Sequence, residues 1–321
     1  MKRTAFVVLS SLLLSVSPGA AQSSGGLFLM LPMGARAVGQ GEAAVADSLL
    51  GTEGLWWNPA GAARGGKREI TVHHSKTLSA TSDMIAFMIP SRLIGTGSGA
   101  FYLVNYGDLP VTGPDGSGTQ LGTVSTHNYL AALSYASAVG SRFSAGLTYK
   151  FLMLRFACSG LCGETPVISG STSAVDVGGQ YRLPAPIPVV IGASIRNLGP
   201  PMQVKDNPQA DPLPRVLQLG GRARIPMDFL TRYESSLDVM LDYKAAAVFD
   251  GAAGSVGAVL GYREQFFLRT GYNREPGGGS GPSLGFGATR GDVSVDLGMR
   301  FDEFSSQTGE IPTYVSVRVR F

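Results

Sequence analysis

The sequence predicts a transmembrane antiparallel β-barrel of about 14 strands. Two observations lead to this fold class. Apolar and polar residues alternate from Arg68 to the end of the chain, and the connections between the alternating segments are long and short in turn. Transmembrane barrels have short turns on the periplasmic side and longer loops on the outer side. A soluble β-sandwich, the alternative reading of the alternation, gives no reason for connections to differ in this way.

The last segment, Thr313–Phe321, carries the clearest strand pattern. Side chains of successive strand residues point to opposite faces, so Ser316, Arg318 and Arg320 share one face. In a soluble edge strand the other face would meet a second sheet, whereas in a barrel it meets lipid and the arginines face a polar lumen. We predict that this apolar face is the signal read by the barrel-assembly machinery: Val315, Val317, Val319 and Phe321.

The N-terminus, residues 1–21, reads as a cleaved secretory signal peptide. Lys2 and Arg3 precede an apolar run over residues 5–16, and Gly19-Ala20-Ala21 supplies small residues at the expected cut. The apolar run is too short to cross a bilayer as a helix. We therefore expect export to the outer membrane of a Gram-negative-type cell.

The composition excludes several other classes of protein. The 321 residues include 44 glycines and only 15% charged residues, and no later segment has 18 consecutive apolar residues, which excludes a helical membrane protein. The net charge of +3 without a basic block gives no indication of nucleic-acid binding. Charged strand residues are assigned to the inner wall, since a charge facing lipid costs about 2–4 kcal/mol near the midplane.

Fourteen segments have about the length that a tilted membrane strand requires. They are centred on 68–77, 80–90, 96–106, 124–138, 141–156, 171–183, 187–197, 213–226, 233–245, 253–263, 265–273, 281–290, 292–302 and 311–321. The expected outer loops are 107–122, 157–170, 198–212, 246–252, 274–280 and 303–310. Only the join at 78–79 is short where a long loop is expected, and the parity places both chain ends on the periplasmic side. Segments 80–90 and 96–106 differ from the others because they are apolar on both faces.

Cys158 and Cys162 are the only cysteines. In an exported chain they favour a small disulfide loop, with free thiols as the alternative. A metal site would need further Cys or His ligands nearby, and the sequence offers none.

The sequence predicts no enzyme, no metal site and no cofactor. Its histidines are His73, His74 and His127, and the first two are neighbours in a strand, so they face opposite sides and cannot form one dyad. No nucleophile elbow or phosphate-binding loop appears.

Several fragments, taken in order, resemble the PorV/PorQ family, which is similar in turn to the FadL-type transporters of hydrophobic compounds. They begin with Gly34-Ala35-Arg36-Ala37-Val38-Gly39-Gln40-Gly41 and Trp57-Asn58-Pro59-Ala60-Gly61, and continue with Asn105-Tyr106-Gly107-Asp108-Leu109, Asn197-Leu198-Gly199-Pro200-Pro201-Met202 and Arg269-Thr270-Gly271-Tyr272-Asn273. Two features depart from the family. Gln40 stands where the family pattern has a glycine or small apolar residue, and the loop 157–170 with its two cysteines is particular to this chain. The resemblance implies that residues 22–67 form a hatch inside a barrel of residues 68–321, with Trp57, Asn58, Pro59 and Gly61 as the hatch motif.

The resemblance also implies the function. A PorV-like protein binds partners or cargo, without catalysis, in type IX secretion or surface attachment. The alternatives are a FadL-like channel for hydrophobic small molecules, an unrelated structural barrel and a barrel enzyme. Expected partners are the lipid bilayer and lipopolysaccharide, the barrel-assembly machinery, and either secretion-system proteins with exported cargo or a hydrophobic small molecule.

Overall fold

Fourteen long antiparallel strands close into one barrel, which confirms the predicted fold class. The computed structural model describes residues 25–91, 93–113, 118–161, 167–204, 210–226, 233–247, 251–276 and 279–321. Each long strand pairs with its neighbours in the chain order, β1 pairs with β16, and β7 pairs with β10. Two short strands, β8 (Met202–Val204) and β9 (Ala210–Asp211), form a hairpin beside β6 outside the ring.

The strands of the ring follow the predicted segments closely. They are β1 (Glu69–Lys76), β2 (Thr81–Ser91), β3 (Gly95–Thr112), β4 (Gln120–Val139), β5 (Phe143–Gly160), β6 (Val167–Arg182), β7 (Val189–Leu198), β10 (Val216–Ile225), β11 (Ser235–Ala246), β12 (Ala252–Tyr262), β13 (Phe266–Arg274), β14 (Gly281–Arg290), β15 (Val293–Arg300) and β16 (Thr313–Arg320). The end of the barrel with the β2–β3, β4–β5 and β14–β15 turns is called the short-turn end below. The opposite end is called the long-loop end.

Four predicted loops need correction, and the one at 198–212 contains the strands β8 and β9. Of the predicted loops 107–122 and 157–170, residues 107–112, 120–122, 157–160 and 167–170 lie in strands, because β3 reaches Thr112 and β5 reaches Gly160. In β3 a register shift between Asn105 and Asp108 absorbs Tyr106-Gly107 as a bulge, so the strand continues where glycine suggested a loop. The loop predicted at 303–310 contains helix α4 (Glu303–Thr308), whose first turn is capped by the Asp302 carboxylate.

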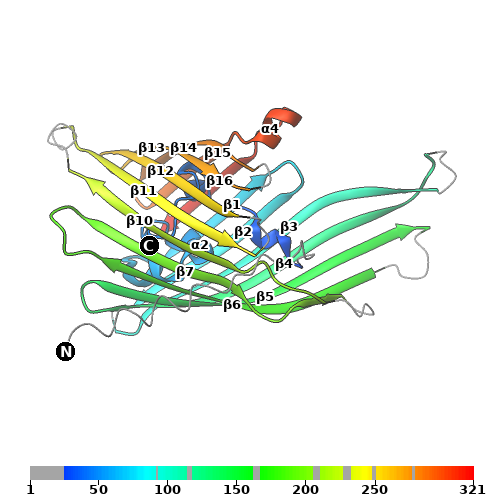
Figure 1. Cartoon of the computed structure of the whole chain (residues 1–321), viewed down its shortest axis with the longest axis horizontal. Coiled ribbons are helices and arrows are strands. Elements are labelled where there is room, and N and C mark those ends of the chain that lie inside the picture. The colour runs from blue at the N-terminus through cyan, green and yellow to red at the C-terminus, as the bar shows by residue number, and fades with distance from the viewer. Residues whose placement is uncertain are drawn as a thin grey trace.

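Strands β3 to β6 are 18, 20, 18 and 16 residues long. A membrane crossing needs about 9–11 residues. Figure 1 shows these four strands running well past the ends of the others on the long-loop side. We call the projecting part, residues 106–112, 120–126, 155–160 and 167–170, the outer ledge.

The outer surface of the barrel is apolar around its middle. In β16, Val317 and Val319 are exposed, whereas Ser316 and Arg318 are completely buried. The same alternation exposes Ile85 and other large apolar side chains on further strands. An outward apolar belt of this kind is what a barrel surrounded by lipid carries. Among the described residues, the helices are all too short or too polar to cross a membrane.

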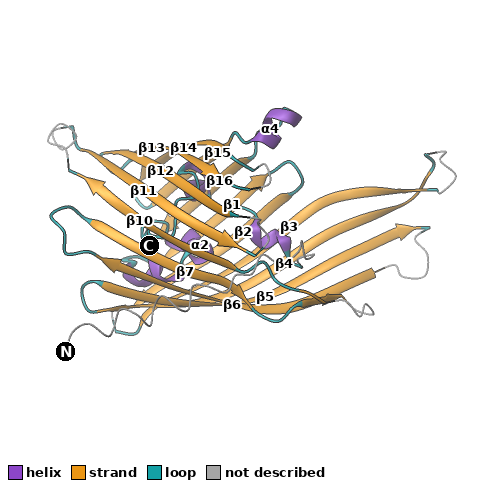
Figure 2. Ribbon diagram, in the orientation of Figure 1, coloured by secondary structure: helices purple, strands orange, loops and turns teal. Residues whose placement is uncertain are grey.

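Residues 25–64 lie inside the ring and are called the hatch below. Their short helices are η1 (Leu27–Met30), α1 (Ala35–Gly39), η2 (Gly51–Glu53), α2 (Gly54–Trp57) and η3 (Pro59–Arg64). The hatch bonds to strands on different sides of the barrel, including β7, β11, β15 and β16, so it crosses the lumen. Figure 2 shows these helices enclosed by the strands.

Candidate functional site

The candidate site is the lumen, whose wall contacts the hatch directly through glycines. Gly298 lies against Ala35, Gly257 against Gln40, and Gly192 against Val45, so a Cβ at each glycine would come within 2.6 Å of hatch backbone. Four further lumen-facing glycines would place a Cβ within 2.9 Å of the hatch, Gly178 against the Asn58 side chain and the others against backbone: Gly146, Gly178, Gly271 and Gly285. Seven strand glycines therefore give the hatch the room it needs to pack against the wall.

The predicted hatch motif lies at the most crowded of these contacts. The Asn58 amide donates to the carbonyls of Val45 (2.7 Å), Gly179 (3.1 Å) and Ala193 (3.3 Å), and its side-chain oxygen accepts from the Ala60 N–H. Asn58 thus ties two hatch segments to β6 and β7, and Pro59 follows it at the start of η3. The motif has a structural role, and its glycine, Gly61, lies over Asp47.

The Trp57 side chain closes the hatch on itself, because its indole N–H donates to the Met33 carbonyl at 2.9 Å. Gln40, which departs from the family pattern, has a similar role. Its buried amide donates to the Ala43 carbonyl (3.0 Å) and the Asp47 carboxylate (3.1 Å). A residue that the sequence marked as atypical therefore holds a hatch turn.

On the side of β13 to β16 and β1, buried ion pairs hold the hatch. The Asp296 carboxylate accepts from Arg36 of the hatch at 2.7 Å and pairs with Arg269 at 2.9 Å. The Arg318 guanidinium lies 3.1 Å from Glu69 and 3.6 Å from Glu53, and it donates to the Leu50 carbonyl. All of these side chains are at least nine-tenths buried.

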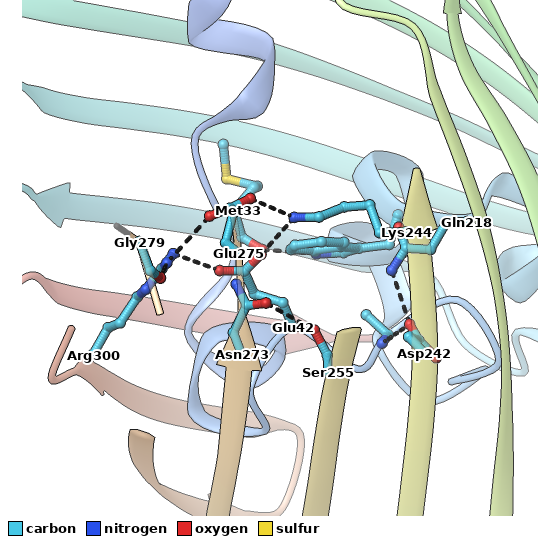
Figure 3. Close-up of polar contacts among 12 residues, drawn as sticks. Met33, Glu42, Gln218, Asp242, Lys244, Ser255, Asn273, Glu275, Gly279 and Arg300 are labelled. Carbon is cyan, nitrogen blue, oxygen red and sulfur yellow. Dashed lines mark hydrogen bonds and ion pairs between the residues drawn. The ribbon is translucent and has the colours of Figure 1, made fainter. Parts of the chain in front are cut away.

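A second polar cluster holds the hatch toward the long-loop end (Figure 3). Glu42 of the hatch pairs with Arg300 at 2.8 Å, and Glu275 pairs with Lys244 at 2.9 Å. The Asp242 carboxylate accepts the backbone N–H groups of Ala44 (2.7 Å) and Val45 (2.9 Å). The charged residues that the sequence assigned to general wall electrostatics thus include specific anchors of the hatch.

The buried charges around the hatch change the pKa of the Asp47 carboxyl. Burial by itself would raise the pKa of the Asp47 carboxyl, but the Arg222 guanidinium and hydrogen bonds from Leu49 and Gln40 lower that pKa below its ordinary value. Asp47 therefore stays ionised and keeps its contact with Arg222 at 3.3 Å.

The opposite side of the lumen, formed by β2 to β6, carries a large apolar cluster beside the buried Lys150–Asp176 ion pair. Met84, Tyr102, Leu130, Leu152 and Ala174 face inward and pack with the hatch tryptophans in one buried cluster. The rings of Trp56 and Tyr102 meet edge to face at 5.3 Å. Segments 80–90 and 96–106 are apolar on both faces of the strand, and residues of their inner faces belong to this cluster.

The apolar surface continues from the cluster onto the outer ledge. Leu154 and Tyr106 are half-buried and pack against the cluster. Phe156 lies two positions beyond Leu154, on the same face, and pairs with Ile168 of β6. Farther out, Val124 pairs with Leu109, which is 58% exposed. We call these residues, from Leu154 and Tyr106 to Leu109, the apolar strip.

Two cations flank the tryptophans where the apolar and polar sides meet. The Lys150 ammonium lies 5.1 Å from the centre of the Trp56 ring, and the Arg196 guanidinium lies 5.4 Å from that of Trp57. Lys150 is also paired with Asp176 at 2.6 Å. Attraction between a cation and an aromatic face adds to the hold on the hatch.

The remaining predicted residues are placed as follows. Cys158 lies in β5, but Cys162 lies outside the described residues, so the predicted disulfide stays a prediction. The signal role of Val315, Val317, Val319 and Phe321 also stays a prediction. His73 is buried against Ser316, whereas His74 is exposed beside Asp83, so the two do face opposite sides.

No protein-family model and no curated protein matches the sequence. Solved structures do match. The toluene transporter TbuX of Ralstonia pickettii has a TM-score of 0.60 at 12% identity, covering 90% of this chain and 98% of that one. The toluene transporter TodX of Pseudomonas putida gives 0.57 at 11%, covering 90% and 96%, and a FadL homologue of Pseudomonas aeruginosa gives 0.54 at 11%, covering 91% and 98%. The chain therefore has the fold of FadL-type barrels.

Proposed function

We propose that the protein is an outer-membrane channel for apolar small molecules. The observation that carries this proposal is the apolar strip, which joins the outer ledge to the cluster around the hatch tryptophans. An apolar surface in a lumen stabilises a ligand by burying the apolar area of that ligand away from water. A polar solute gains little from such a surface, whereas an apolar solute does. The similarity in fold to two toluene transporters supports the same class of solute.

A sideways exit into the bilayer fits this solute class. On the outside of β2 to β5 lies a groove of about 490 Å³, lined among others by Phe87, Phe101 and Phe151. Its floor includes Ala132, which also belongs to the inner cluster, so only a methyl group projects into the lumen from this position of β4.

The orientation follows from the connections. The short-turn end is assigned to the periplasm and the outer ledge to the cell exterior, as in outer-membrane barrels generally. Residues 1–21 are assigned as the export signal that precedes assembly.

Uptake measurements test the proposal. The chain would be produced in a Gram-negative host that lacks such a channel, and the entry of radiolabelled toluene would be followed. We expect uptake above that of cells without the protein, and a fall to about that background for Phe156→Asp, because a charge in the strip makes the path costly for an apolar solute.

The matched control is Ser159→Asp, which adds the same charge to the opposite face of β5, where Ser159 is exposed. It should transport like the unaltered chain. Uptake no greater than background for the unaltered protein, at normal barrel yield, would remove toluene-like solutes from consideration. Equal uptake by Phe156→Asp would show that the strip is not the path.

A PorV-like role in secretion or surface attachment is the second candidate. The outer ledge favours it, because four paired strands project beyond the belt and expose Leu109, Leu161 and Val167 to solvent. Exposed apolar residues on a rigid sheet suit the binding of a protein partner. The resemblance of the hatch fragments to the PorV/PorQ family points the same way.

Purification in mild detergent separates the two candidates. Mass spectrometry that finds secreted proteins or a large barrel partner with the chain supports the secretion role. A solitary barrel that carries an apolar small molecule supports the channel.

A further inference from the structure

A polar cavity of about 470 Å³ lies between the hatch and the short-turn end of the barrel. Its roof includes Arg36, Asp47 and Leu49 of the hatch, and its sides come from β1, β10, β11, β13 and β16. Ligand sites in proteins generally have volumes of about 300–1,000 Å³. The cavity is therefore large enough for a small organic molecule, and the apolar strip does not reach it.

Cations dominate the lining of this cavity. Seven cationic side chains line it, against four carboxylates. The carboxylates are shared: Asp238 pairs with Arg222 at 2.9 Å and with Arg224 at 3.0 Å. Asp296, the shared partner of Arg36 and Arg269, is 1% exposed and does not line the cavity. The positive groups thus face the space while part of the compensating negative charge lies behind them.

Arg64 contributes a positive charge that no carboxylate balances in the described part of the chain. Its guanidinium donates to the backbone carbonyls of Gly140 (3.1 Å) and Phe143 (3.3 Å). Among the described residues, no carboxylate lies within 4.0 Å of it, and its Nε is shielded from solvent without a hydrogen-bond partner. Arg224, whose side chain is 44% exposed, lines the same cavity. Arg224 bonds to Asp238 through its Nε and Nη2, which leaves its Nη1 as a donor for an anion beside the Arg64 guanidinium.

We propose that this cavity binds a small organic anion bearing carboxylate or phosphate groups, with Arg64 and Arg224 as its main contacts. Planar guanidinium groups match the oxygens of both kinds of anion in pairs of parallel hydrogen bonds. The site opens toward the short-turn end, on the far side of the hatch from the apolar strip. It is separate from the proposed channel path, so either proposal can fail without the other.

The test is equilibrium dialysis of the purified full-length barrel in detergent. The probes are radiolabelled succinate and inorganic phosphate, at constant ionic strength, with succinamide as the uncharged counterpart of succinate. We expect saturable binding of at least one anion at one site per chain, and no competition by succinamide. Arg64→Gln and Arg224→Gln should each weaken binding about tenfold, the loss of one charge-assisted hydrogen bond.

Arg263→Gln is the matched control. Arg263 lies at the same end of the barrel, is 53% exposed and paired with Glu234, and does not line the cavity, so its replacement should leave binding unchanged. Arg64→Gln and Arg224→Gln are both tested, so that the result does not depend on one variant that fails to fold. The heat-dependent gel shift of a closed barrel reports whether each variant has folded. The proposal is overturned if neither anion binds saturably, if succinamide competes as well as succinate, or if both folded variants bind like the unaltered chain.

Discussion

Single glycines decide how tightly the hatch fits. A Cβ on Gly178 would lie 2.0 Å from the Asn58 side-chain oxygen, whereas one on its neighbour Gly179 would meet nothing closer than 3.7 Å. Alternation explains the difference, because Gly178 faces the lumen and Gly179 faces outward. Neither position was singled out in the sequence, where 44 glycines made any one of them uninformative. The informative signal is a mid-strand glycine on the lumen face.

We predict that Gly178→Ala pushes the Asn58 turn off the wall. The change should cost about 1–3 kcal/mol through overpacking and should raise ion conductance through the barrel in planar bilayers. Gly179→Ala is the matched control and should change stability by less than about 0.5 kcal/mol without any leak. A tight barrel for both variants would mean that this contact does not seal the lumen.

Arg318 is a completely buried charge that contacts the hatch at Glu53 and Leu50. Replacing it with methionine leaves the carboxylates of Glu53 and Glu69 buried without their shared cation, so we predict a loss of about 3–5 kcal/mol. Urea unfolding followed by tryptophan fluorescence measures this, because both tryptophans lie in the hatch. The control is Arg320→Gln in the same strand. Arg320 is 35% exposed, and its loss should cost less than about 1 kcal/mol. Equal losses for the two variants would contradict the special role of Arg318.

The hatch is the element on which the closed state of the lumen depends. We predict that deletion of residues 25–64 converts a poorly conducting barrel into an open pore, measured as single-channel conductance. Replacement by a glycine-serine segment of equal length is the control. It should also conduct, since it lacks the anchors at Asp242, Asp296 and Arg318. Unchanged conductance after the deletion would show that the hatch does not plug the barrel.

Strands were the most predictable elements, and their ends the least. Alternation and connection length located every strand of the ring, because lipid on one side and a polar lumen on the other impose period two. The outer ledge was missed, since Gly107 and Gly160 read as loop residues. In the structure both have positive φ, and the strands continue to or beyond them. Pairing with a long neighbour outweighs the local preference of a glycine.

At the scale of the whole molecule, the lumen has two unlike halves. Alternation alone predicts a polar inner face throughout, and this holds for β10 to β16. The half formed by β2 to β6 instead holds an apolar cluster, into which Trp56 and Trp57 pack, beside the ion pair of Lys150 and Asp176. The sequence shows that strands 80–90 and 96–106 are apolar on both faces. It does not show that they contact the tryptophans, since that contact joins segments far apart in the chain.

The pairing of β1 with β16 has a kinetic consequence. Glu69 and Arg320, which bond across this seam, are 251 positions apart, so the seam forms only after the whole chain has been delivered. Contacts between such distant residues form slowly. Because the hatch directly precedes β1 and Arg318 arrives with β16, the hatch reaches its final packing only when the seam closes. The contacts of Arg318 with Leu50 and Glu53 and the closure of the ring thus belong to one late step of maturation.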